Sequence, residues 1–183
     1  MPIDSNHSPS PTKEALQKII AAKSVEKHLE DIGNYHYDKK IFYREDNQLF
    51  LAKKCLLVEG PNDKYGLPIL AKTLSKDVGG CTVISCNGKE KIKHYKTLCE
   101  AFGISAFVVF DEDNKPVNEG ENALLIQLCG NDRYSFKSSF EEILARKLNI
   151  SERKILNEIE NIMVENVPEE IVNCIDAIVN WLT

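Results

Sequence analysis

The sequence lacks any long hydrophobic run. No stretch of the 183 residues approaches the roughly 18 uninterrupted apolar residues that a membrane-spanning helix needs. Residues 1–12 are rich in serine and proline and have no apolar centre of the kind that a secretory signal peptide carries. We therefore expect a cytoplasmic protein with no membrane partner.

Closely spaced cysteine pairs are also missing. The six cysteines include no Cys-x-x-Cys sequence, and zinc ribbons and thioredoxin-like motifs depend on that spacing. Most of the cysteines lie in apolar runs, such as those that begin at Cys55 and Cys81. This placement predicts buried free thiols.

Motifs for nucleotide binding and for nucleophilic catalysis are absent. The chain contains no Gly-x-x-x-x-Gly-Lys-Ser/Thr, no Gly-x-Gly-x-x-Gly and no Gly-x-Ser-x-Gly. We do not expect it to hydrolyse ATP by itself or to use a serine nucleophile. His94 lies in a lysine-rich helical pattern, which favours an exposed helix residue over a metal ligand.

The chain has no excess of basic residues. Its net charge is −5, and residues 151–183 account for all of it, with two basic and seven acidic side chains. Residues 1–150 are therefore neutral. Overall acidity argues only weakly against nucleic-acid binding, because attraction to phosphate depends on local charge.

Hydrophobic patterning predicts an α/β fold. Four short apolar runs are typical of strands: Cys55–Val58, Cys81–Ser85, Ala106–Phe110 and Ala123–Leu128. Helical patterns cover Lys13–Leu29, Asp63–Leu74, Glu90–Phe102, Ser139–Leu148, Ser151–Val164 and Pro168–Leu182. Strands that alternate with helices favour a central, mostly parallel sheet of about four strands flanked by helices. Residues 1–12 are expected to be a disordered leader and residues 13–50 a helical connecting segment.

Acidic residues follow two of the predicted strands. Glu59 comes directly after the first strand, and the sequence Asp111-Glu112-Asp113 comes directly after the third. The carboxyl ends of parallel strands face a shared crevice, so these groups should meet at one edge. Because side chains alternate along an extended backbone, Asp111 and Asp113 should point to the same side and Glu112 away.

Such a cluster needs a counter-charge. Neighbouring carboxylates repel and raise one another's pKa, so a bound divalent cation is the natural compensation. Hard oxygen ligands favour Mg²⁺, Mn²⁺ or Ca²⁺ over zinc. Two alternatives stay open: Asp113 could simply begin a loop, and Asp63 could be an acid of the first helical turn, where the helix dipole favours it.

A group of lysines begins the second predicted helix. The segment after the turn at Asn87-Gly88 has one acidic residue, Glu90, and four basic residues, Lys89, Lys91, Lys93 and Lys96. Lysines and backbone amides at a helix N-terminus can hold phosphate, which makes Lys89, Lys91 and Lys93 candidates for nucleic-acid contacts. A solvated helix face explains the same pattern equally well.

Three ordered motifs resemble a known family. Residues 57–63 read Leu-Val-Glu-Gly-Pro-Asn-Asp, Asn87-Gly88 follows the second strand, and residues 108–114 read Val-Val-Phe-Asp-Glu-Asp-Asn. This order resembles the Toprim domain, and the lead-in at residues 49–54 is similar to that of the OLD (overcoming lysogenization defect) nucleases. The resemblance runs from about Leu49 to Leu182. It implies a Rossmann-like Toprim core over residues 51–150, with residues 151–183 as the C-terminal helical part of the same domain.

The resemblance also implies a set of site residues. Matched to the motifs, the metal ligands would be Glu59, Asp63, Asp111, Asp113 and Glu141. Glu142 is the alternative to Glu141 as the fifth ligand. Lys154 lies at about the position where the OLD nucleases have a late lysine. The expected cofactor is Mg²⁺ or Mn²⁺, as two ions.

The activity that the resemblance implies is divalent-metal-dependent hydrolysis of DNA by an endonuclease or nickase. OLD proteins carry an ABC-type ATPase ahead of this domain, so a separate ATPase subunit is an expected partner, and an oligomer stays open. Two alternatives remain: a DNA-binding module that depends on a partner, and a Toprim nuclease that processes RNA.

Overall fold

The computed structural model describes residues 48–113 and 119–183. The predicted leader and the predicted helix over Lys13–Leu29 lie outside these residues. Within the described ranges, no helix combines the length and the apolar character that crossing a bilayer requires.

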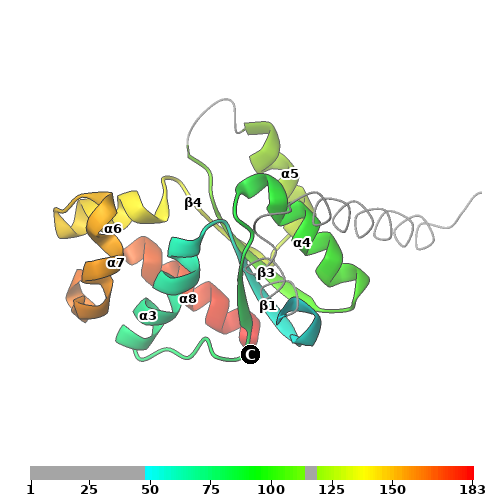
Figure 1. Ribbon diagram of the computed structural model, residues 1–183, viewed down its shortest axis with the longest axis horizontal. Coiled ribbons are helices and arrows are strands. Elements are labelled where there is room, and N and C mark those ends of the chain that lie inside the picture. The colour runs from blue at the N-terminus through cyan, green and yellow to red at the C-terminus, as the bar shows by residue number, and fades with distance from the viewer. Residues whose placement is uncertain (1–47, 114–118) are drawn as a thin grey trace, which may run out of the picture.

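A four-stranded parallel sheet lies at the centre of the fold (Figure 1). Its strands are β1 (Lys54–Val58), β2 (Thr82–Ser85), β3 (Ser105–Asp111) and β4 (Arg133–Phe136), in the order β2-β1-β3-β4. The register places Val58 of β1 opposite Ser85 on one side and Val109 on the other. The predicted α/β class, with a parallel sheet of about four strands flanked by helices, is confirmed.

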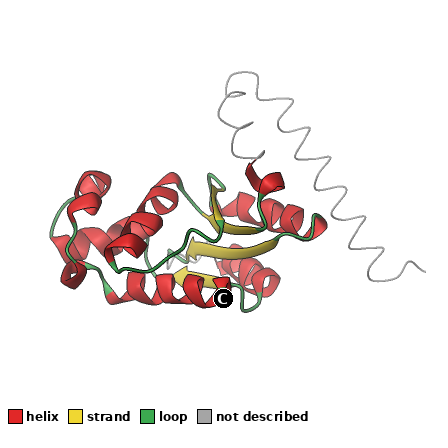
Figure 2. Ribbon diagram, turned by 90° about the horizontal axis from the view of Figure 1, so that it is seen from below, coloured by secondary structure: helices red, strands yellow, loops and turns green. Residues whose placement is uncertain are grey.

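Helices cover both faces of the sheet, as Figures 1 and 2 show. One face packs against α4 (Lys89–Ala101) and α5 (Glu119–Cys129), and the other against α3 (Pro61–Thr73), α6 (Phe140–Leu148) and α8 (Glu169–Leu182). Alternate side chains of β1 enter the two cores, since Leu56 joins one hydrophobic cluster and Leu57 the other. A strand buried on both faces needs a continuous apolar run, which is what β1 and β3 have.

The last helix closes the larger core. Ile171, Cys174, Ile175 and Ile178 of α8 are buried, and their spacing of three and four residues makes one apolar stripe. Each fully buried isoleucine contributes roughly 2 kcal/mol. Lys54, at the start of β1, donates from Nζ to the carbonyl oxygen of Leu182 at 2.7 Å, which fixes the C-terminal end of α8 to the sheet.

One predicted strand was wrong. Residues 123–128 belong to helix α5, and the fourth strand is the more polar Arg-Tyr-Ser-Phe segment of β4. A short apolar run does not by itself distinguish a strand from a buried helix. In the helix, Leu125 and Cys129 stand four residues apart and are buried, while Leu124 and Ile126 are exposed.

The predicted helix over Ser151–Val164 is broken into short pieces. They are η2 (Glu152–Lys154), α7 (Ile155–Glu158), η3 (Ile159–Asn161) and η4 (Val164–Asn166). Ile155 and Ile159 are buried one turn apart, as an amphipathic helix requires. The chain then becomes extended at Ile162, whose side chain is also buried. The helical run ends here because Ile162 reaches the core with an extended backbone rather than a helical one.

All six cysteines are free, and five of them are buried. The predicted buried thiols are thus confirmed for all but Cys81, which is partly exposed.

The contact between α3 and α6 depends on a glycine. A Cβ atom at Gly66 would lie 2.6 Å from Cζ of the buried Phe140 ring. We expect Gly66→Ala to lower the free energy of unfolding by about 1 to 3 kcal/mol through overpacking, measured by thermal or urea denaturation. Gly120→Ala is the matched control, because nothing lies within 4 Å of its added Cβ. Equal stability of the two variants would contradict this packing.

Candidate metal and catalytic site

The candidate site lies where β1 and β3 end. Glu59 directly follows β1, and its Oε2 accepts a hydrogen bond of 3.2 Å from the backbone N–H of Asp111, the last residue of β3. The parallel register brings the two residues to the same edge of the sheet, as the sequence predicted. Burial of the Glu59 carboxyl raises its pKa, the hydrogen bond from Asp111 opposes this, and the charge of Asp113 adds to the increase.

Asp63 reaches the same edge from the first turn of α3. Its Oδ2 accepts a hydrogen bond of 2.9 Å from the N–H of Gly60, which precedes the helix. This bond satisfies a free amide at the helix start, so Asp63 does act as a first-turn acid. Its side chain is nevertheless 5% exposed, and the charges of Glu141 and Glu59 act on it.

A fourth carboxylate comes from α6. Glu141 Oε1 accepts a hydrogen bond of 2.5 Å from Nδ2 of Asn62, the neighbour of Asp63 on α3. Glu142, the competing candidate, instead pairs with Arg146 at 2.8 Å on an exposed part of the same helix. Glu141 is therefore the glutamate that faces the other acids.

The buried acids perturb one another strongly. Burial raises the pKa of Asp63 to about 7, and the charges of Glu141 and Glu59 add to the effect. Burial likewise raises the pKa of Asp111 to about 8, with contributions from Asp63, Glu59, Glu141 and Asp113. Loss of solvation and like-charge repulsion both disfavour the charged form. We call these five residues, Glu59, Asp63, Asp111, Asp113 and Glu141, the acidic edge.

One buried oxygen of the acidic edge lacks a hydrogen-bond partner among the residues that the structure describes. Asp111 Oδ1 is buried and accepts no hydrogen bond from residues 48–113 or 119–183, although an unsatisfied buried acceptor is costly. Among residues 48–113 and 119–183, no three acidic, histidine or cysteine side chains are already gathered as a finished metal site. The oxygen donors and the orphaned Oδ1 fit a hard divalent cation that would complete the set.

Comparisons with known proteins point to one family. Residues 50–113 match the family model described as "Overcoming lysogenization defect protein-like, TOPRIM domain". This stretch of the chain is therefore similar to the OLD-like Toprim domain. The match includes four members of the acidic edge, Glu59, Asp63, Asp111 and Asp113.

Individual proteins also resemble this chain. The chain is 36% identical over 75 residues to a protein named OLD nuclease from Thermus scotoductus. The aligned region is 40% of this chain and 14% of that protein. The chain thus spans only a small part of this relative's length. The C-terminal region of the Burkholderia pseudomallei OLD protein has a similar fold, with a TM-score of 0.56, 16% identity, and coverage of 72% of this chain and 99% of that one. The corresponding region from Xanthomonas campestris pv. campestris gives a TM-score of 0.51 at 14% identity, with coverage of 74% and 96%.

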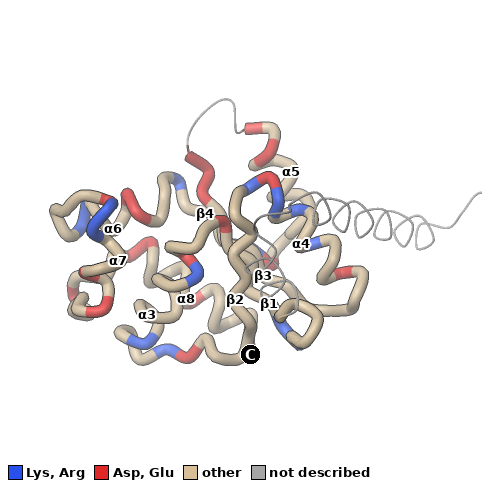
Figure 3. The backbone as a smooth tube through the Cα atoms, in the orientation of Figure 1, with Lys and Arg blue, Asp and Glu red and all other residues tan. Residues whose placement is uncertain are grey.

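Asp113 of the acidic edge pairs with a lysine. Lys89 Nζ, at the start of α4, lies 3.0 Å from Asp113 Oδ2. Figure 3 shows the acidic end of β3 beside the charged start of α4. Asp113 has a φ of 58°, a left-handed conformation that aspartate tolerates better than most residues.

Among the described residues, no ion pair joins the other candidate lysines to these acids. Lys93 pairs with Glu121 of α5 at 3.3 Å, and Lys91 is partly exposed on α4. Lys154 is exposed at the end of η2, and within the described part of the chain no ion pair joins it to the acidic edge. The half-buried His94 also lies on α4.

Glu112 points away from the acidic edge, as its alternation with its neighbours predicted. Its carboxylate accepts hydrogen bonds from Ser135 Oγ at 2.6 Å and from Lys137 Nζ at 2.5 Å. These partners, Lys137 foremost, hold the pKa of Glu112 below its ordinary value.

Sequence reasoning missed one residue of the site, Asn62, and one buried core residue near it, Cys174. Asn62 holds Glu141, and its position inside the Val-Glu-Gly-Pro-Asn-Asp motif could have suggested a role. Cys174 of α8 is fully buried, and the charges of Asp63 and Asp111 act on its thiol. No local signal marks Cys174, because only the packing of α8 against the sheet brings it there.

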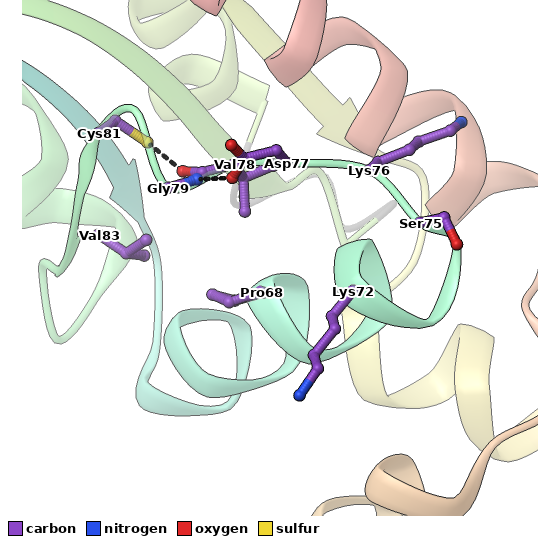
Figure 4. Close-up of a pocket in the computed structure, with 9 residues that line it drawn as sticks. All are labelled: Pro68, Lys72, Ser75, Lys76, Asp77, Val78, Gly79, Cys81 and Val83. Carbon is purple, nitrogen blue, oxygen red and sulfur yellow. Dashed lines mark hydrogen bonds between the residues drawn. The ribbon is translucent and has the colours of Figure 1, made fainter.

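A separate surface pocket of about 540 Å³ lies at the opposite end of α3. Figure 4 shows its lining: Pro68, Lys72, Ser75, Lys76, Asp77, Val78, Gly79, Cys81 and Val83. None of these residues belongs to the acidic edge, so the pocket and the candidate site are distinct.

Proposed function

We propose that this domain is a divalent-metal-dependent DNA endonuclease or nickase that hydrolyses phosphodiester bonds. The observation that carries the proposal is the convergence of carboxylates from β1, α3, β3 and α6 around an unpartnered buried oxygen of Asp111. The carboxylates of the acidic edge repel one another when they are ionised. A bound cation would relieve this repulsion and would give Asp111 Oδ1 a partner. The similarity to the OLD nuclease of Thermus scotoductus supports nuclease chemistry.

The five members of the acidic edge would hold Mg²⁺ or Mn²⁺, as two ions. Divalent cations at such a site activate a water molecule and stabilise charge on the attacking and leaving oxygens of phosphate. Asn62 would fix the orientation of Glu141 through its 2.5 Å hydrogen bond. The N–H of Asp111 would hold Glu59 in place.

DNA is the proposed substrate, and the charged start of α4 is its proposed contact. Lys91 and Lys93 are partly exposed there, where local positive charge can attract phosphate despite the acidic total. Lys89 belongs to the same helix start but is buried. Lys154 stays the candidate for the late lysine that would offset charge on the reacting phosphate.

We further propose a cytoplasmic setting and cooperation with a separate ABC-type ATPase. Free cysteines persist in reducing compartments. The ATPase is proposed from the resemblance to the OLD nucleases alone.

Incubation of the purified chain with supercoiled plasmid tests the proposal. Nicked or linear product should form with Mg²⁺ or Mn²⁺ and not with EDTA. Cleavage of structured RNA in preference to the plasmid would favour an RNA-processing nuclease. No cleavage of either substrate by a folded chain, with any of these cations, would contradict an autonomous nuclease.

The adjacent glutamates of α6 give a matched pair of variants. We expect Glu141→Gln to lower plasmid cleavage on the order of 100-fold, because it removes a charge that would hold the cation. Glu142→Gln should leave the rate nearly unchanged, because Glu142 pairs with Arg146 on an exposed surface. Initial cleavage rates at saturating Mg²⁺ measure both effects, and a larger loss at Glu142 would contradict the assignment.

A further inference from the structure

Lys89 is a cation buried at the acidic edge. It is 7% exposed, its Nζ lies 3.0 Å from Asp113 Oδ2, and its charge also acts on Glu59. A buried lysine needs such a partner, because an unpaired buried charge is strongly disfavoured.

The backbone fixes Lys89 in this place. The N–H of Gly88 donates to the carbonyl oxygen of Glu59 at 2.9 Å, which ties the start of α4 to the end of β1. Gly88 has a φ of 129°, a conformation that favours glycine. The helix start is therefore built to direct its first side chain toward the acids.

Other lysines of α4 are directed elsewhere. Lys93 pairs with Glu121, and Lys96 lies 3.6 Å from Glu100 and donates to the carbonyl oxygen of Ala106 at 3.4 Å. The pairing of Lys89 with Asp113 is thus a property of its position rather than of the lysine-rich sequence.

Lys89 contributes to the balance of charge at the acidic edge. The five carboxylates of the acidic edge bring five negative charges when ionised, and two divalent cations would bring four positive charges. Lys89 supplies the fifth. A lysine that already occupies one oxygen of Asp113 also competes with a cation for that carboxylate and repels it.

We propose that Lys89 is the built-in counter-cation of the acidic edge, a positioning residue that holds Asp113 and weakens the binding of the second divalent cation. This inference rests on the proposed function, since it concerns the metal ions of the same site. It assigns to Lys89 a role in setting cation affinity in place of direct contact with DNA.

Calorimetric titration of the whole chain with Mn²⁺ tests the inference without using cleavage. Wild type should show two binding events of different strength. Lys89→Met should tighten the weaker one by about tenfold, as expected when one nearby like charge is removed from a partly buried site. Lys89→Arg, which keeps the charge, should stay within about twofold of wild type.

Lys72→Met is the control, because it removes the same charge from an exposed position at the far end of α3. It should not change Mn²⁺ affinity. Circular dichroism verifies that each variant is folded, and Lys89→Gln replaces Lys89→Met if the latter is not.

The outcomes separate the two proposals. If wild type binds Mn²⁺ and neutral variants at position 89 bind it no more tightly, the inference about Lys89 is overturned and the proposed function stands. If neither wild type nor these variants bind Mn²⁺, the proposed function itself fails, and the inference fails with it.

Discussion

Replacing Asp111 with asparagine, or Glu59 with glutamine, is expected to lower plasmid cleavage on the order of 1000-fold, the scale of losing a central electrostatic group of an active site. Both residues stand at the meeting point of β1 and β3, joined by the 3.2 Å hydrogen bond from the Asp111 N–H. Each substitution keeps the shape of the side chain and removes the charge. Initial rates of nicking at saturating Mg²⁺ measure the effect.

Glu112→Gln is the matched control for this experiment. Glu112 follows Asp111 in the sequence, but its carboxylate contacts Ser135 and the exposed Lys137. The Lys137 end of this ion pair is exposed and contributes little to stability, and glutamine keeps an oxygen that can accept from Ser135 Oγ, so the variant should fold and cleave as wild type does. If Asp111→Asn cleaves as well as Glu112→Gln, the acidic edge is not the catalytic site.

The Asp111→Asn variant is also expected to be more stable than wild type in EDTA at pH 8. The pKa of Asp111 is about 8 and that of Asp63 about 7, both raised chiefly by burial. Each unit of pKa shift corresponds to about 1.4 kcal/mol, so ionisation of these acids costs the folded state several kcal/mol. We expect an increase of about 5 to 10 °C in the Tm of the variant.

The direction of this effect follows from linkage. Below the ordinary pKa of an aspartate, both the folded and the unfolded chain hold the proton, and the group costs no stability. Between that value and about 8, the folded state keeps a proton on Asp111 that the unfolded state has released, so stability falls as pH rises. Above this range both states are ionised and the penalty is constant.

Thermal denaturation of wild type and Asp111→Asn from pH 4 to pH 9 in EDTA measures the difference. The gap in Tm should be near zero at pH 4 and should widen toward pH 8. Saturating Mn²⁺ should stabilise wild type at pH 8 and reduce the gap. A gap that stays constant with pH would show that Asp111 is not the source of the penalty.

Three of the four strands and most of the acidic edge were predictable because they depend on local sequence. Apolar runs end at Val58 and Phe110, and acids follow at once, so strand ends and candidate ligands could be read together. The parallel order then placed Glu59 beside Asp111 without knowledge of the packing.

Other features depend on tertiary contacts that no local pattern encodes. The apolar run at residues 123–128 forms helix α5 because Leu125 and Cys129 are buried against the neighbouring core. The choice of Glu141 over Glu142 follows from the docking of α6 beside Asn62. Lys89 resembled a surface lysine in the sequence, and only the start of α4 at the sheet edge buries it.

A crystal structure of the chain soaked in Mn²⁺, with anomalous scattering recorded from the metal, tests the central claim most directly. We expect a strong anomalous peak within bonding distance of Asp111 Oδ1 and Glu59, with a second peak toward Asp113. Well-ordered crystals that show no peak at the acidic edge, or a peak only at another place on the molecule, would contradict a metal-dependent nuclease site there.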